Sequence, residues 1–72
     1  MNLDKIRKRV TGGFRPFSVL TSDGNSYAVP HPEFILVGKS AVAVTDQEGD
    51  IAVLDPLHIV ALKDIPGRQK AA

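Results

Sequence analysis

Turn-forming residues recur so often along this chain that no regular element can be long. Clusters containing glycine, proline, aspartate or serine occur at residues 11–13, 22–25, 30–33, 38–40, 46–50 and 55–56. Most of the stretches between them are rich in aliphatic or aromatic residues and have the usual length of β-strands, about five residues. Short strands joined by frequent tight turns are typical of small antiparallel barrels and sandwiches. The spacing therefore predicts a mainly β domain.

Six stretches are predicted to form strands, and the clearest pair is a hairpin. Asp23-Gly24 lies between two β-forming runs, an arrangement that favours a tight hairpin turn. The predicted strands cover residues 17–21, 26–29, 34–37, 41–45, 51–54 and 57–62. A barrel is favoured because it leaves few unpaired strand edges in a chain with so few strands. We therefore expect a small antiparallel barrel of five to six strands.

The first residues are predicted to form one short helix, over residues 2–11. Asn2 is a favourable N-cap residue, and the two glycines after the helix are typical of a helix end. Leu3, Ile6 and Val10 recur at helical spacing and form one apolar stripe. Because a helix this short is unstable alone, we expect the stripe to dock on the β domain.

The chain has 72 residues and no cysteine, so no disulfide or thiolate metal site can stabilise it. A chain of this length buries only about 60% of the surface that it exposes when unfolded. We therefore expect close packing or self-association to stabilise it. It has no apolar run long enough for a membrane span, and we expect a cytoplasmic protein.

The predicted domain occupies residues 1–65, and residues 66–72 are expected to form a flexible C-terminal tail. The strand pattern also predicts which side chains form the core. The predicted core residues are Phe17, Val19, Leu20, Tyr27, Val29, Phe34, Ile35, Val42, Val44, Ile51, Val53, Leu54, Val60 and Leu62.

The net charge of +1 conceals three blocks of opposite sign. Residues 1–15 carry five basic residues against one acidic residue, residues 16–62 carry one against six, and residues 63–72 carry three against one. The N-terminal block therefore contacts an acidic face of its own body or of a neighbour, or it binds a polyanion. The candidate polyanion-binding residues are Lys5, Arg7, Lys8, Arg9 and Arg15.

The turn His31-Pro32-Glu33 places a histidine beside a carboxylate, a pairing that can supply a base or a metal ligand. Catalysis also needs an orienting group and a pocket, and the sequence identifies neither. A rigid turn is therefore the favoured interpretation. A hydrolase or metal enzyme centred on His31 and Glu33 remains an alternative, as does a metal site formed by His31, Asp55 and His58.

Asp46, Glu48 and Asp50 alternate in one loop, with oxygens at a spacing that also occurs in calcium loops. The distal glutamate and flanking helices of that motif are missing. A solvated acidic hairpin tip is therefore predicted. No catalytic, metal-binding or cofactor-binding residue is assigned, and we expect no cofactor.

The order of a basic helix followed by strands of a small bent barrel resembles the Sm-like RNA-binding fold and the related SH3-like barrels. Asp23-Gly24 stands where that family has its first hairpin turn, and Leu57-His58-Ile59-Val60 is similar to its closing strand. This resemblance implies RNA binding.

A second resemblance, to small bacterial proteins of unknown function, rests on three segments. These are Arg15-Pro16-Phe17, Asp23-Gly24 and Val29-Pro30-His31-Pro32-Glu33-Phe34, which match R-P-F, D-G and V-x-H-P-[DE]-F. It implies a shared fold and no specific activity.

Two functional hypotheses follow from these patterns. The first is a non-catalytic binding or assembly module that forms homo-oligomers, because the core is thin. The second is an Sm-like protein that binds RNA through its basic N-terminal helix. An acidic protein surface is the other partner that this helix would fit, and no membrane partner is expected.

Overall fold

The computed structural model describes residues 1–65, so the predicted flexible tail at 66–72 lies outside the described residues. One helix precedes six strands, as the pattern of turns predicts. The helix is α1 (Leu3–Thr11), and the strands are β1 (Phe17–Thr21), β2 (Ser26–Val29), β3 (Ile35–Val37), β4 (Val42–Thr45), β5 (Ile51–Leu54) and β6 (Ile59–Asp64). Two 3₁₀ turns, Pro32–Phe34 and Pro56–His58, precede β3 and β6.

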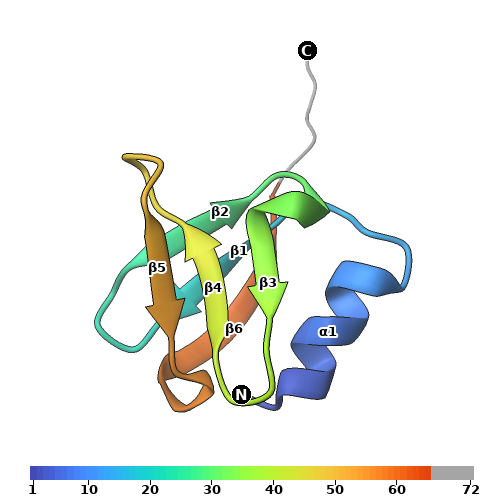
Figure 1. Cartoon of the computed structure of the whole chain (residues 1–72), viewed down its shortest axis with the longest axis horizontal. Helices are drawn as coiled ribbons and strands as arrows, with labels where there is room; N and C mark the ends of the chain where they lie inside the picture. The colour runs from blue at the N-terminus through green and yellow to red at the C-terminus, as the bar shows by residue number, and fades with distance from the viewer. Residues whose placement is uncertain (66–72) are drawn as a thin grey trace.

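The strands form two antiparallel three-stranded sheets, ordered β2-β1-β6 and β3-β4-β5. Figure 1 shows the second sheet in front of the first, with α1 beside β3. β2 and β4 contact each other between the layers. No ladder of hydrogen bonds joins the two sheets into a closed barrel within residues 1–65.

The helix has the ends that its sequence predicts. The Asn2 side chain accepts a hydrogen bond from the Asp4 N–H at 2.7 Å, and the Gly12 N–H donates to the Lys8 carbonyl at 2.8 Å. Gly13 then adopts a φ of 83°, which glycine tolerates far better than other residues. Ile6 is fully buried, so the apolar stripe docks on the sheets as expected.

The core lies between the two sheets and under α1. Its buried apolar members are Ile6, Phe17, Val19, Val29, Ile35, Val42, Val44, Leu54 and Ile59. Tyr27, Phe34 and Leu62, which were also predicted to be in the core, are half-buried and pack against it. Leu20 is also half-buried.

The core prediction is wrong for Ile51, Val53 and Val60, which are exposed. In β5, Leu54 faces the core, so the alternation of a strand turns Ile51 and Val53 outward. In β6, the turn Pro56–His58 delays the start of the strand to Ile59, which is buried in place of Val60. The pairing with β1 also shifts its register between Leu20 and Thr21.

Candidate functional site

The sheet β3-β4-β5 presents an outward surface without a single charged side chain. In the strand register Leu36 lies opposite Ala43, and Ala43 lies opposite Val53. Thr45 and Ile51 form the next outward pair. These five residues are called the outer face below. Leu36, Ile51 and Val53 are 70%, 67% and 72% exposed, which is unusual for large aliphatic side chains that share one face of a small sheet.

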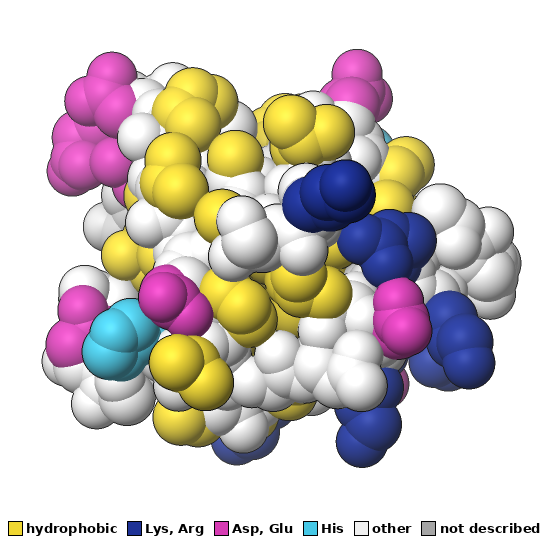
Figure 2. Space-filling view, turned by 60° about the horizontal axis from the view of Figure 1, so that its bottom comes forward, with side chains coloured by type: hydrophobic (Ala, Val, Ile, Leu, Met, Phe, Trp, Pro, Cys, Tyr) yellow, Lys and Arg dark blue, Asp and Glu magenta, His cyan; other side chains and the backbone are white. Residues whose placement is uncertain are grey.

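The outer face is hollowed toward the end of β4. A shallow depression of about 410 Å³ is lined there by outer-face residues from all three strands, with Glu33 and Phe34 at its border. In Figure 2 apolar side chains extend across the upper part of the molecule. Acidic side chains gather at the upper left and also appear at the upper right, and Lys and Arg side chains gather at the right, with an acidic side chain among them. The apolar surface therefore has charged margins of opposite sign.

The acidic margin is the loop between β4 and β5. Asp46 Oδ1 accepts hydrogen bonds from the N–H groups of Glu48, at 3.0 Å, and Asp50, at 2.9 Å. Gly49 closes the loop with a φ of 86°. Because Asp46 stabilises the loop from inside, the side chains of Glu48 and Asp50 stay exposed. We call Glu48 and Asp50 the acidic tip, as the sequence predicts.

Two of the five candidate polyanion-binding residues are engaged within the chain. Arg9 pairs with Asp64 of β6, and its guanidinium lies 5.1 Å from the centroid of the Phe17 ring. Arg7 pairs with Asp4 at 2.8 Å and donates to the Gly38 carbonyl at 3.1 Å. The basic helix therefore makes contacts with its own body, but neither of these acidic partners belongs to the acidic block 16–62.

The other three candidate cations, Lys5, Lys8 and Arg15, are exposed. Lys5 and Lys8 lie one helical turn apart on α1, whereas Arg15 follows the helix in the connection to β1. The structure thus leaves a smaller cationic surface than the five residues predict.

The ion pair with Arg9 changes the acidity of its partner. The hydrogen bond from Arg9 lowers the pKa of Asp64 below its ordinary value of 3.8, and the charges of Arg9 and Arg15 act in the same direction. In the hairpin tip, hydrogen bonds from the Thr21 hydroxyl and the Asn25 backbone likewise lower the pKa of Asp23. Both carboxylates therefore stabilise local structure in their ionised form.

The turn containing His31, Pro32 and Glu33 is built as a rigid connection. Pro32 opens the 3₁₀ turn, and the Phe34 N–H donates to the His31 carbonyl at 3.1 Å. The His31 ring lies 5.7 Å from the Phe34 ring, centroid to centroid, and Glu33 is exposed. Within residues 1–65, no side chain forms a hydrogen bond that would orient the His31 ring.

His58 lies in a different turn with different neighbours. Its Nδ1 is 3.3 Å from the Ser22 hydroxyl, while Asp55 accepts from the Leu57 N–H at 2.9 Å. Within residues 1–65, no three His, Asp or Glu side chains are close enough to hold a metal ion. The described structure therefore does not form the His31–Asp55–His58 metal site considered as an alternative.

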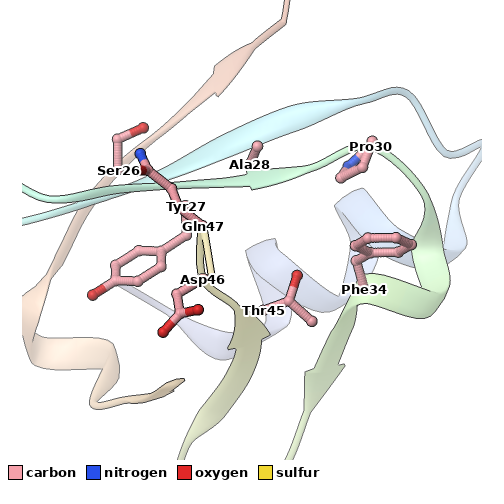
Figure 3. Close-up of a pocket in the computed structure, with 8 residues that line it drawn as sticks. All are labelled: Ser26, Tyr27, Ala28, Pro30, Phe34, Thr45, Asp46 and Gln47. Atoms are coloured by element: carbon pink, nitrogen blue, oxygen red, sulfur yellow. The ribbon is translucent and has the colours of Figure 1, made fainter. Parts of the chain in front are cut away.

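A second hollow, missed by the sequence interpretation, lies between β2 and the end of β4. It encloses about 260 Å³ and is lined by Ser26, Tyr27, Ala28, Pro30, Phe34, Thr45, Asp46 and Gln47. Figure 3 shows the Tyr27 and Phe34 rings at opposite ends, with Thr45 between them. Both rings were predicted to be in the core. The sequence carries no signal for this hollow, because three separate segments form it.

No protein-family model, curated protein or solved structure matches this chain. No helix within residues 1–65 has the length and apolar character needed to cross a membrane.

Proposed function

We propose that this protein is a non-catalytic binding and assembly module of the small SH3-like or Sm-like barrel type, and that it self-associates through the outer face. The observation that carries the proposal is the exposure of Leu36 on β3 and of Ile51 and Val53 on β5, on one face of a single sheet with only Ala43 and Thr45 of β4 between them. Contiguous apolar side chains of this size mark interaction surfaces more often than scattered ones do. A cytoplasmic protein with this surface would gain stability by covering it.

The expected association is weak. Complete burial of one large aliphatic side chain contributes about 1.5–3 kcal/mol. Association itself costs an estimated 4–15 kcal/mol in lost translational and rotational freedom, so roughly the contribution of three such side chains is needed to offset it. The outer face provides three in each copy, so a face-to-face pair buries six, which contribute about 9–18 kcal/mol at full burial and leave a modest surplus over that cost. Oligomers should therefore form at micromolar or higher concentration and dissociate on dilution.

The proposal is tested by sedimentation velocity from low-micromolar to millimolar protein. The wild-type sedimentation coefficient should rise with concentration, whereas Val53→Lys should stay monomeric because it places a charge in the outer face. Val60→Lys is the matched control, since Val60 is also exposed but belongs to the other sheet. A wild-type protein that remains monomeric throughout would overturn the proposal.

RNA binding through the basic helix stays an alternative. It would depend chiefly on Lys5, Lys8 and Arg15, the candidate cations that are exposed and outside the ion pairs of Arg7 and Arg9. Titration of a fluorescent single-stranded RNA at low salt tests it. Binding that falls steeply with salt and is lost in Lys5→Glu/Lys8→Glu would favour this function.

A further inference from the structure

The two ends of the outer face carry opposite charges because of the order of the strands. β4 begins after Lys39 and ends before the acidic tip, so these charges lie at opposite ends of the strand. At about 3.3 Å per residue, four residues separate the ends by roughly 13 Å. Arg7 joins Lys39 at the basic end, since it donates to the carbonyl of the adjacent Gly38.

We propose that two copies stack outer face against outer face in antiparallel orientation, with the acidic tip of each copy over Lys39 and Arg7 of the other. This inference rests on the proposed self-association and specifies its geometry. The two-fold axis would lie in the interface, inclined to the perpendicular of the strands, so that the β4–β5 corner of one copy covers the β3–β4 corner of the other. Such an axis turns one face over the other and exchanges its two ends.

Charge complementarity is the reason to choose a second copy as the occupant. In the antiparallel stack, each acidic tip meets a basic end, and the favourable contact occurs twice. If the two copies were stacked with their strands parallel, the acidic tips would face each other and so would the basic ends. The outer face between the ends is uncharged, so an identical face covers it without burying a charge.

The basic end also contains two carboxylates, Asp4, which pairs with Arg7 at 2.8 Å, and Asp55, at the end of β5. Asp55 is the N-cap of the turn Pro56–His58, where it accepts from the Leu57 N–H at 2.9 Å. Glu33 lies before β3, at the same end of the sheet as the acidic tip, and adds to its negative charge. The N-terminal ammonium donates to the Pro56 carbonyl and adds a positive charge at the basic end. Three positive groups therefore stand against two carboxylates at this end, whereas Glu33 and the acidic tip are all negative, so the opposition of the two ends persists.

The charges should decide the orientation, and the apolar side chains should supply most of the affinity. Exposed ion pairs contribute little individually and weaken with salt. Complementary charges nevertheless select one arrangement over another, because like charges brought together are repulsive. Dimerisation should consequently weaken as salt rises, but it should not be abolished.

Two charge-reversal variants test the stacking geometry. Glu48→Lys/Asp50→Lys makes both ends of the outer face basic, and Lys39→Glu makes the basic end more acidic. Each variant alone should dimerise about tenfold more weakly than the wild type at low salt. A mixture of the two should form a heterodimer more tightly than either forms a homodimer, because both pairs of ends are then complementary. Lys63→Glu is the control, since Lys63 is an exposed residue of β6 in the other sheet.

The outcomes separate this inference from the proposed function. Stronger association in the mixture, with no effect of Lys63→Glu, supports the antiparallel stack. If both variants dimerise like the wild type while Val53→Lys does not, self-association through the outer face stands and the antiparallel stack is wrong. If the wild type is monomeric, both proposals are wrong.

Discussion

The guanidinium of Arg9 lies 5.1 Å from the centroid of the Phe17 ring, and the same guanidinium pairs with Asp64. Phe17 is fully buried in β1 and also contacts Phe14, with the ring centroids 5.9 Å apart. One helical side chain thus connects α1 to both β1 and β6. Arg9 belongs to the predicted polyanion-binding group, and in the structure it links secondary-structure elements of its own chain.

Replacing this arginine should destabilise the fold. We expect Arg9→Ala to lower the free energy of unfolding by about 1–2 kcal/mol, since it removes a partly desolvated cation–π contact and an ion pair. Arg9→Lys should recover part of the loss, because it keeps the charge but not the planar guanidinium. Urea unfolding followed by circular dichroism measures both effects.

Lys5→Ala is the control for this experiment, because Lys5 is an exposed cation on the same helix. Its effect should stay within about 0.5 kcal/mol. If Arg9→Ala and Lys5→Ala lowered the free energy of unfolding equally, the stabilisation would come from the overall charge of the helix and not from the contact between Arg9 and Phe17.

The Arg9–Asp64 pair also predicts how stability depends on pH. The pKa of Asp64 is lower in the folded protein than its ordinary value of 3.8, mainly because of the hydrogen bond from Arg9. Its contribution is therefore fully present well above pH 3.8 and is lost as the pH falls through the lower folded pKa. Asp64→Asn should be less stable than the wild type at pH 7, and the difference should shrink below pH 4.

A double-mutant comparison isolates this effect. In the Arg9→Ala background the pH dependence of the Asp64→Asn effect should largely disappear, because the main cause of the lowered pKa is gone. Unfolding curves at pH 7 and at about pH 3 supply the measurement. A pH dependence unchanged by Arg9→Ala would mean that another cation, such as Arg15, lowers the pKa of Asp64.

Neighbouring residues of β6 should respond very differently to truncation. Ile59 is 3% exposed and Val60 is 59% exposed. Ile59→Ala should cost about 2–5 kcal/mol through lost burial and a cavity, whereas Val60→Ala should change stability by less than about 1 kcal/mol. Thermal and urea unfolding of the two variants check the register of the last strand. Similar losses in both would mean that β6 is rotated from the described register.

The helix and the first hairpin could be predicted because local residues specify them. Asn2 caps α1 and Asp23-Gly24 separates β1 from β2 through contacts within a few residues. The helical spacing of the apolar stripe likewise indicates that Ile6 faces the core. The last strand shows where this reasoning fails. The run 57–62 is apolar except for His58. Asp55-Pro56 indicates a turn, but nothing local shows that the turn extends to His58 and that the strand begins only at Ile59.

The sequence by itself determined the number, type and approximate limits of the elements, because turns, caps and strand alternation depend on neighbouring residues. Only the tertiary structure decided which face of β5 is buried, where Arg9 binds and that oppositely charged ends flank an uncharged sheet face. These features depend on contacts between residues far apart in the chain, such as Arg9 with Asp64. An alternating strand pattern identifies two faces, and the neighbouring sheet determines which of them is exposed.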